Sequence, residues 1–354
     1  MKDYNKELAD LMMYVAKEGA SDLHLTVGRR PSLRISGELI QLHKKEILTP
    51  EDTEGLIFTM LTKENQDVFL KKHDLDFSFT FEDKMRFRVN SFFQRGFMGA
   101  ALRLIPVVVK SLEDLNLPPL LSEFAMRSQG FFLVVGPTGH GKTTTLASMV
   151  EIINREKAAH IMTIEDPIEY IFTPQQSIVD QREVGSDTND FKTALRSMFR
   201  EDINVAMIGE MRDHETISAA VTAAETGHLI FSSLHTNNAA QTIDRIIDSF
   251  PSDQQGQIRS QLSNTLLGIF SQRLLSRVSG DRIPAYELLI ANTAVRNLIR
   301  ENKIHEIDLV IETGSESGMV SLNQSLIDLV RKGEITMDVA RSYSLNPQAL
   351  AREL

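Results

Sequence analysis

The sequence contains no cysteine, and this absence excludes several kinds of chemistry. Without cysteine the chain can form no disulfide, bind no zinc through thiolates and use no cysteine nucleophile. No apolar run approaches the roughly 18 residues that a membrane span requires. The first residues form an amphipathic helical pattern that carries acidic side chains and lacks the apolar segment and cleavage site of a signal peptide. We therefore expect a cytoplasmic protein that associates with the membrane only through partners.

An excess of positive charge is also absent. The chain has 38 Lys and Arg residues against 48 Asp and Glu residues, which gives a net charge of −10 at pH 7. General nucleic-acid binders usually carry a basic domain, so this balance predicts no nucleic-acid partner, although it does not exclude a local basic groove. The length of 354 residues favours two domains, and a hydrophobic content of 42% is ordinary for a globular protein.

The segment GPTGHGKT, from Gly136 to Thr143, matches the phosphate-binding pattern G-x-x-x-x-G-K-S/T at every position. An apolar run of strand type precedes it and a helical pattern follows it, which is the context that a phosphate loop needs. Its glycines let backbone N–H groups approach phosphates, Lys142 would pair with the β- and γ-phosphates, and the Thr143 hydroxyl would ligate Mg²⁺. The alternative is a glycine-rich turn that matches by chance. We predict a nucleoside triphosphate site formed by Gly136, Pro137, Thr138, Gly139, His140, Gly141, Lys142, Thr143 and Thr144.

Hydrophobic periodicity predicts an α/β fold in two parts. Residues 1–106 show alternating strand patterns and three helical patterns, which are typical of a smaller α+β domain with an antiparallel sheet. Residues 107–119 resemble a linker. Residues 120–354 begin with alternating strands and helices, which predicts a mainly parallel sheet. The predicted strands of this second part are 131–135, 160–165, 204–208 and 228–234, its predicted helices are 143–155, 188–200 and 214–226, and the chain beyond 236 is predicted to be mostly helical.

Acidic side chains follow two of these predicted strands. One strand leads into Glu165-Asp166-Pro167-Ile168-Glu169, at the sheet edge where open α/β sheets build their sites. Taken alone, such a cluster is a polar loop as often as a site. A second strand leads to Glu210, as in a Walker B segment whose carboxylate holds Mg²⁺. The intervening Gly209 makes that match weak by itself.

Histidines and arginines supply further candidates. His228 and His235 stand at the two ends of one predicted strand. A lone histidine there is more often a surface residue, but a pair that follows the acids favours a sensor of the γ-phosphate. Arg86 and Arg88 take one face of a predicted strand, and Arg103 lies on the next. From spacing alone the arginines fit a solvated sheet face better than a phosphate-binding cluster.

Four segments in a fixed order closely resemble the Walker A, Asp-box, Walker B and His-box motifs of the secretion ATPase superfamily, which drives type II secretion and type IV pili. The segments are GPTGHGKT, TIEDPIEY, IGEMRDHET and TGHLIFSSLHTN. The resemblance covers nearly the whole chain. It implies a PAS-like N-terminal domain, a RecA-like ATPase domain, a homo-hexameric ring, and hydrolysis of ATP with Mg²⁺.

The resemblance also implies roles for the candidate residues. Glu169 matches the position of the general base for the attacking water, and Glu210 matches the acid that supports Mg²⁺. His228 and His235 match positions near the γ-phosphate. The N-terminal segment whose arginines reach over the phosphates is matched by Arg86, Arg88 and Arg103. The resemblance therefore favours the phosphate-binding interpretation of the arginines, without choosing one of them.

Within the superfamily, two features favour the branch that retracts pili. Without cysteine the chain cannot form the four-cysteine zinc motif of assembly ATPases, and at 354 residues we expect it to be too short for their additional N-terminal region. Its segment AVRNLIRE, residues 294–301, resembles the AIRNLIRE motif of retraction ATPases. This branch implies as partners the inner-membrane platform protein of the pilus and related motor ATPases, and a peripheral position at the inner face of the cytoplasmic membrane. The motif, with Arg296, is expected to serve retraction rather than hydrolysis.

Two alternatives stay open at this point. The first is a pilus-assembly or type II secretion ATPase of the same superfamily, and the second is a nucleotide-dependent motor or regulatory module unrelated to pili. The chain also departs from the family in its phosphate loop, where His140 stands at a position that the family usually fills with serine. His140 could add a titratable donor beside the phosphates.

Overall fold

The computed structural model describes residues 2–35, 37–82, 85–105 and 108–353, and the chain divides into two compact units. The first unit runs to Val108 and includes Glu169–Ile171, and the second comprises Val109–Ile168 and Phe172–Leu354. The predicted domain boundary, at residues 106 and 107, lies outside the described residues. Each unit has its own sheet and its own hydrophobic core.

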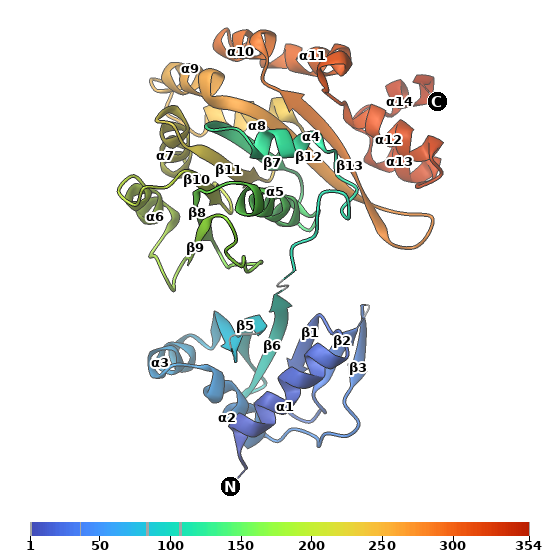
Figure 1. Cartoon of the computed structure of the whole chain (residues 1–354). Coiled ribbons are helices and arrows are strands. Elements are labelled where there is room, and N and C mark those ends of the chain that lie inside the picture. The colour runs from blue at the N-terminus through green and yellow to red at the C-terminus, as the bar shows by residue number, and fades with distance from the viewer. Residues whose placement is uncertain (1, 36, 83–84, 106–107, 354) are drawn as a thin grey trace. The chain divides into compact units, whose positions relative to one another are not determined.

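The first unit is built on a six-stranded antiparallel sheet with the strand order β3-β2-β1-β6-β5-β4 (Figure 1). Its strands are β1 (Asp22–Leu25), β2 (Ser32–Ile35), β3 (Glu38–Gln41), β4 (Asp74–Phe81), β5 (Met85–Gln94) and β6 (Phe97–Ile105), and its helices are α1 (Tyr4–Lys17), α2 (Pro50–Met60) and α3 (Lys63–Lys72). The antiparallel α+β arrangement agrees with the alternating patterns of the sequence.

Helix α2 begins where its sequence predicts. The Thr49 hydroxyl accepts a hydrogen bond from the Asp52 N–H at 3.2 Å, and the Asp52 carboxylate accepts one from the Thr49 N–H at 3.1 Å. This reciprocal cap satisfies two N–H groups that a helix start would otherwise leave unpaired, and Pro50 occupies the first position, where no N–H is needed. The capped helix buries Leu56 in the same core as Leu11 of α1. Both helices therefore cover the apolar face of the first sheet.

The second unit contains a seven-stranded sheet with the order β13-β12-β7-β11-β10-β8-β9. All its neighbouring strands are parallel except β12 and β13. The strands are β7 (Gly130–Val135), β8 (His160–Glu165), β9 (Ile178–Glu183), β10 (Val205–Ile208), β11 (Leu229–Leu234), β12 (Leu266–Ser276) and β13 (Arg282–Ile290). The predicted class, α/β with a mainly parallel sheet in the second part, is confirmed.

Helices cover both faces of this sheet (Figure 1). They are α4 (Leu120–Ala125), α5 (Lys142–Glu156), α6 (Phe191–Met198), α7 (His214–Glu225), α8 (Ala239–Asp248), α9 (Gln255–Thr265), α10 (Thr293–Arg300), α11 (Ile307–Thr313), α12 (Leu322–Arg331), α13 (Met337–Tyr343) and α14 (Pro347–Glu353), with short 3-10 helices at Ile304–Glu306 and Ser315–Ser317. Phe131, Leu133 and Val135 of β7 share one core with residues of α6 to α9. Phe132 faces the other way, and its ring centroid lies 4.6 Å from that of Phe124 in α4. This alternation explains the continuous apolar run of β7.

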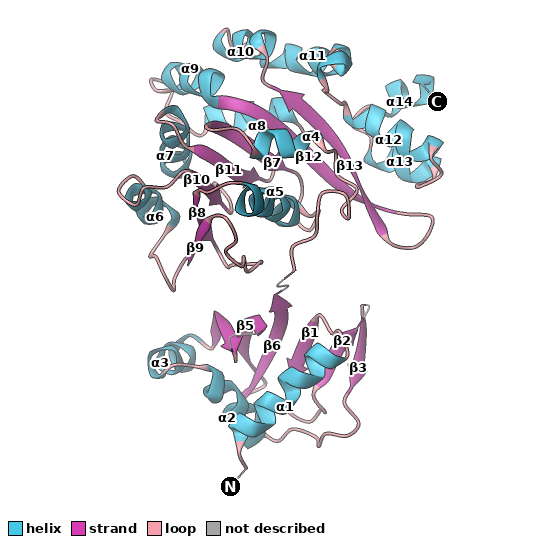
Figure 2. Cartoon of the chain, in the orientation of Figure 1, coloured by secondary structure: helices cyan, strands magenta, loops and turns pink. Residues whose placement is uncertain are grey.

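The prediction that the chain beyond residue 236 is mostly helical is wrong for one segment. Residues 266–290 form the β12–β13 hairpin, whose strand β12 pairs with β7 in parallel. The apolar runs of this hairpin are buried on both faces, so they lack the polar alternation that would have indicated strands. Figure 2 shows the hairpin with α12, α13 and α14 beside it, and these elements share a small separate core. Among the described residues, no helix combines the length and the apolar character needed to cross a bilayer.

Candidate functional site

The segment GPTGHGKT runs from the end of β7 into the first turn of α5, and we call residues 136–144 the P-loop. Gly136, Gly139 and Gly141 have φ angles of 145°, 78° and 81°, which side-chain-bearing residues rarely adopt. Thr143 and Thr144 lie in the first turn of α5. The N–H groups of a first turn point away from the helix and carry a partial positive charge, so this end of α5 suits an anion.

Lys142 is folded back over the P-loop. Its side chain is buried, and Nζ donates to the carbonyl oxygens of Gly136 at 3.0 Å and Pro137 at 2.9 Å. A lysine ammonium is a compact charge with three donors, and both carbonyls belong to the loop itself. The charge is therefore placed over the loop rather than in open solvent.

His235 connects the P-loop to the acid that follows β10. Its Nδ1 lies 3.2 Å from Thr138 Oγ1 and 3.5 Å from Lys142 Nζ, and its Nε2 lies 3.3 Å from Glu210 Oε2. Arg212 pairs with the other carboxylate oxygen of Glu210. Because β7, β11 and β10 are parallel neighbours, their carboxyl ends meet at one edge of the sheet. The structure thus brings together the P-loop, Glu210 and His235.

His228 does not belong to this group. Strand β11 pairs with β7 from Leu229 opposite Gly130 to Leu234 opposite Val135, so His228 stands before the start of β11, at the edge away from the P-loop. A strand of this length separates its two ends by about 20 Å. His228 Nδ1 lies 3.0 Å from the Ala223 carbonyl oxygen at the end of α7. The prediction that both histidines lie near the γ-phosphate is therefore wrong for His228 within one chain.

The acidic segment after β8 is held by buried carboxylates. The Thr163 hydroxyl donates to Glu165 Oε1 at 2.6 Å, and Glu183 Oε2 accepts from the Ile168 N–H at 3.0 Å. Glu165 and Glu183 are both almost fully buried, so they shape the loop rather than face solvent. Glu169, one residue beyond this anchored stretch, is exposed and belongs to the first unit. Its role as general base stays a prediction.

The three candidate arginines share one face of the sheet of the first unit. Arg88 pairs with Arg103 across β5 and β6, and Arg86 follows on the same face two residues away. Arg103 Nε donates to Asp22 Oδ1 at 2.9 Å. Burial acts to raise the pKa of Asp22, but hydrogen bonds from Ser21 and Arg103 hold that pKa below its usual value. Arg103 therefore has a carboxylate partner, whereas the exposed Arg88 has its charge at the surface.

The β12 strand forms the opposite wall of the P-loop. Gln272 Nε2 donates to the His140 carbonyl at 2.8 Å, and the His140 ring accepts a hydrogen bond from the Leu274 N–H at Nδ1, also at 2.8 Å. The imidazole of His140 is thus turned towards β12, and its Nδ1 serves as an acceptor. The expectation of a titratable donor at this position beside the phosphates does not fit Nδ1. Burial and the charges of neighbouring cations lower the pKa of His140 below its usual value.

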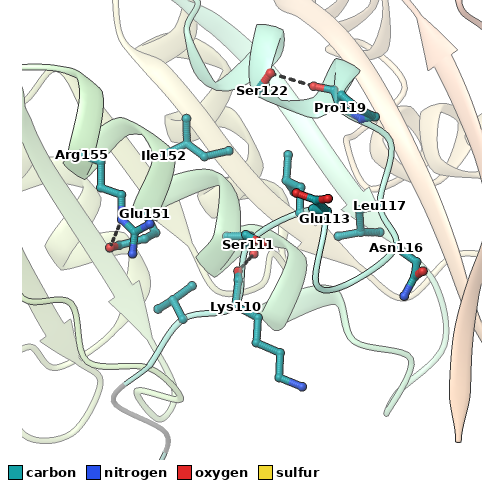
Figure 3. Close-up of a pocket in the computed structure, with 13 residues that line it drawn as sticks. Lys110, Ser111, Glu113, Asn116, Leu117, Pro119, Ser122, Glu151, Ile152 and Arg155 are labelled. Carbon is teal, nitrogen blue, oxygen red and sulfur yellow. Dashed lines mark hydrogen bonds and ion pairs between the residues drawn. The ribbon is translucent and has the colours of Figure 1, made fainter.

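A cavity of about 560 Å³ lies beside α5, further along the helix from the P-loop. Figure 3 shows that it is walled by the segment 109–119 and by side chains of α5. Leu117 and Ile152 supply apolar surface, while Glu113 and Asn116 supply polar groups at its rim. Its volume lies within the range of small-molecule sites, roughly 300–1,000 Å³.

The segment 294–301 falls on α10, and Arg296 is the residue that ties this helix to its neighbours. Its guanidinium donates to four backbone carbonyls at 2.6–3.0 Å, those of Ser263, Asn264, Leu266 and Ala291. Two of these carbonyls belong to the last turn of α9, and a third belongs to the first residue of β12. Arg296 therefore caps α9 and fixes the entry into β12, rather than presenting its charge to a partner.

Behind the site, Glu287 of β13 is a buried carboxyl. Its Oε1 accepts a hydrogen bond from the Ala239 N–H at 2.7 Å, so it caps α8, the helix that follows His235 in the chain. Burial raises the pKa of Glu287 to about 7. Arg273 of β12 donates to the Asn237 carbonyl at 2.8 Å and thus holds the same connection from the other side.

Taken together, the second unit presents a cationic loop at a helix start, a carboxylate at the end of a neighbouring strand, and a histidine between them. Such an arrangement can hold a polyphosphate and polarise its terminal group. Sequence reasoning missed Gln272 and Glu287, because both lie on the unrecognised hairpin. The segment Ser271-Gln272-Arg273, three polar residues within an apolar run, was the signal that could have drawn attention to it.

Comparisons with known proteins agree with this geometry. The family model described as "Type II/IV secretion system protein" matches residues 3–282. The chain is 42% identical over 342 residues to a Pseudomonas aeruginosa protein described as "Type IV pilus retractation ATPase PilT", covering 97% of this chain and 99% of the relative. It is 44% identical over 322 residues to a "Twitching motility protein" of Neisseria gonorrhoeae, covering 91% of this chain and 86% of that protein.

Among solved structures, the fold is similar to the crystal structure of the pilus retraction motor PilT with bound ADP. The TM-score is 0.91 at 47% sequence identity, and the match covers 97% of this chain and 98% of the other. The predicted RecA-like fold class is confirmed by this likeness.

Proposed function

Because the chain belongs to the type II/IV secretion system protein family, we propose that it is an ATP-hydrolysing motor that powers the retraction of type IV pili. The single observation that carries this proposal is the match over nearly the whole chain to retraction ATPases. The geometry of the P-loop, Glu210 and His235 supports the hydrolytic part of it. As in its relatives, we infer that the chain promotes twitching motility.

In this proposal the residues of the site bind and orient the triphosphate. The N–H groups of the P-loop and the start of α5 hold the β-phosphate, and Lys142 exchanges its loop carbonyls for phosphate oxygens. His235 Nε2 faces Glu210 and its Nδ1 faces Thr138. A movement of the ring on binding or loss of the γ-phosphate would therefore change its contacts with both residues. Glu169 is proposed to orient the attacking water, because in-line attack needs a positioned nucleophile and little other covalent chemistry.

Mg²⁺ fits the donors that the chain offers beside the P-loop. Thr143 offers a hydroxyl and Glu210 a carboxylate, both hard oxygen ligands of the kind that this ion prefers. Mg²⁺ usually takes only one or two ligands from the protein and the rest from phosphates and water. This habit agrees with the finding that no cluster of three or more His, Asp or Glu side chains suited to a metal occurs in the described part of the chain. When bound, the ion would neutralise charge on the phosphates.

The base and ribose of ATP are proposed to enter the cavity beside α5. Ser148, which lines the cavity, lies six residues beyond Lys142, or about 9 Å along the helix axis. That spacing suits the reach of a nucleoside from the β-phosphate. Apolar surface from Leu117 and Ile152 would face the base, and Asn116 offers hydrogen bonds at the rim.

Assembly and location are part of the same proposal. We propose a homo-hexamer in the cytoplasm that docks at the inner face of the cytoplasmic membrane on the platform protein of the pilus, together with related motor ATPases. Arg86, Arg88 and Arg103 are proposed to reach the nucleotide phosphates, since they form one cationic stretch on the sheet of the first unit. Arg103 is held by its pair with Asp22, whereas the exposed Arg88 has its charge at the surface.

Hydrolysis by the purified full chain tests the proposal. The wild-type protein should hydrolyse ATP in the presence of Mg²⁺, and Lys142→Ala should lose nearly all of this activity because the charge over the phosphates is gone. Lys157→Ala, at the end of α5, is the matched control, since Lys157 Nζ instead donates to the Arg127 carbonyl. Equal activity of wild type and Lys142→Ala would refute an ATPase at the P-loop.

A further inference from the structure

Strand β12 passes unusually close to the P-loop. It pairs with β7 as far as Ser271 opposite Val135 and then continues beyond the end of β7, beside the loop. A Cβ placed on Gly136 would lie 2.4 Å from the carbonyl oxygen of Gln272, and one on Gly141 would lie 3.0 Å from Gln272 Nε2. The first distance is shorter than any ordinary contact. The loop and the strand are therefore in contact through both their backbones and the Gln272 side chain.

The Gln272 amide is buried and uses both of its ends. Its Oε1 accepts a hydrogen bond from the Thr145 hydroxyl at 2.6 Å, and its Nε2 donates to the His140 carbonyl at 2.8 Å. The reverse orientation of the amide would bring its oxygen against the carbonyl oxygen, so the contacts fix the orientation. His140 belongs to the loop and Thr145 to α5. A single side chain therefore connects strand, loop and helix.

The hydrogen bond to His140 also sets the direction of a loop N–H group. In a trans peptide the carbonyl and the following N–H lie in one rigid plane and point in opposite directions. Because the His140 carbonyl points at Gln272, the Gly141 N–H points away from β12. Phosphate loops bind through N–H groups that converge on the anion, so their orientation decides affinity.

The ring of His140 makes a second attachment to the same strand. Its Nδ1 accepts from the Leu274 N–H at 2.8 Å, at a level where β7 has already ended. The partner of Leu274 on β13 is Pro284. The ring centroid of His140 also lies 6.4 Å from that of Tyr343 in α13, edge to face. The loop is thus fixed to β12 through the backbone and the side chain of one residue.

We propose that Gln272 is a positioning residue, which holds the P-loop in the shape that receives phosphates, with the His140 ring as a second anchor on β12. This inference rests on the proposed function, because it concerns how the same site binds nucleotide. It explains why a histidine suits this position in the chain: a serine hydroxyl is shorter than an imidazole and would not reach across to the Leu274 N–H. Loosening either anchor should weaken nucleotide binding more than it slows the chemical step.

The test compares variants of the full chain in ADP binding and in ATP hydrolysis. Gln272→Leu removes both hydrogen bonds, and Gln272→Glu places an oxygen opposite the His140 carbonyl. Each should raise the Kd for a fluorescent ADP analogue, and the KM for ATP, about tenfold, as expected for the loss of one or two buried hydrogen bonds. The kcat should fall by less than about threefold, because Lys142, Glu210 and His235 are untouched. His140→Ala should act likewise, and His140→Asn, whose amide oxygen can replace Nδ1 as acceptor, should recover most of the affinity.

Gln261→Leu is the matched control, because it removes a hydrogen bond between α9 and Glu225 of α7, away from the P-loop. A Gln272→Leu protein with unchanged Kd, a loss confined to kcat, or an equal rise in Kd for Gln261→Leu would overturn the proposal. If Gln272→Leu shows no thermal unfolding transition, the His140 variants decide, and equal weakening by alanine and asparagine would refute the anchor. Failure of the wild type itself to bind ADP or hydrolyse ATP would instead refute the proposed function.

Discussion

Glu287→Gln should be less stable than the wild type at acid pH and more stable than the wild type at alkaline pH. The Glu287 carboxyl is only 7% exposed, and burial raises its pKa from 4.5 to about 7. The hydrogen bond from the Ala239 N–H and the charge of Arg273 act in the opposite direction without cancelling this effect. The folded chain therefore keeps a proton on Glu287 over a pH range in which the unfolded chain has released it.

Proton linkage gives the sign and the size of the effect of Glu287 on the free energy of unfolding. Below pH 4.5 Glu287 is protonated in both the folded and the unfolded chain, so its burial does not destabilise the fold. As the pH rises from 4.5 to about 7, only the folded chain keeps the proton, and the free energy of unfolding falls. Above about pH 7 this loss of stability is complete. The pKa difference corresponds to about 3 kcal/mol. Glutamine keeps an oxygen for the Ala239 N–H and cannot ionise, but burying its unpaired NH₂ group costs about 1 kcal/mol. Glu287→Gln should thus be about 1 kcal/mol less stable than wild type at pH 4.5 and about 2 kcal/mol more stable at pH 8.

The difference in stability is measured by thermal unfolding of the wild type and Glu287→Gln at pH 4.5 and pH 8. For a unit of this size, 2 kcal/mol corresponds to a rise of about 4–8 °C in Tm at pH 8. Glu316→Gln, which changes an exposed carboxyl, should follow the wild type at both pH values. A Tm difference between Glu287→Gln and wild type that is the same at both pH values would refute the reasoning.

Two further predictions concern residues whose place the structure revised. Arg296→Ala should lower Tm by several degrees and reduce ATP hydrolysis as well as twitching, because four backbone carbonyls lose a charged donor worth about 1.5–3 kcal/mol. Asn297→Ala, which changes an exposed residue of the same helix, is the control. Intact ATP hydrolysis in Arg296→Ala would contradict this prediction. His235→Ala should lower kcat about 100-fold, whereas His228→Ala should change kcat far less; equal losses in steady-state assays would restore His228 to the site.

Much of the site could be predicted because its signals are local. The P-loop needs glycines at fixed positions between a strand and a helix, and the acid and histidine follow strands whose apolar runs are recognisable. Parallel strands then place Glu210 and His235 at one edge. The same rule separates the two ends of a strand, and its consistent use would have excluded His228.

The parts that could not be predicted depend on long-range contacts. Gln272 contacts His140, from which it is separated by 132 residues in the sequence, and no local sequence pattern near either residue predicts this contact. Arg296 looks like a surface charge on an amphipathic helix, yet its guanidinium is taken up by carbonyls of α9 and β12. The β12–β13 hairpin escaped recognition because strands buried on both faces lose their alternation.

Pili counted on cells that lack the gene test the central claim most directly. We expect such cells to be hyperpiliated and unable to twitch, and we expect the wild-type gene, but not Lys142→Ala, to restore normal pilus number and twitching. Cells without pili would indicate an assembly motor and contradict the account. Restoration by Lys142→Ala would contradict it equally, because retraction would then not depend on hydrolysis at the P-loop.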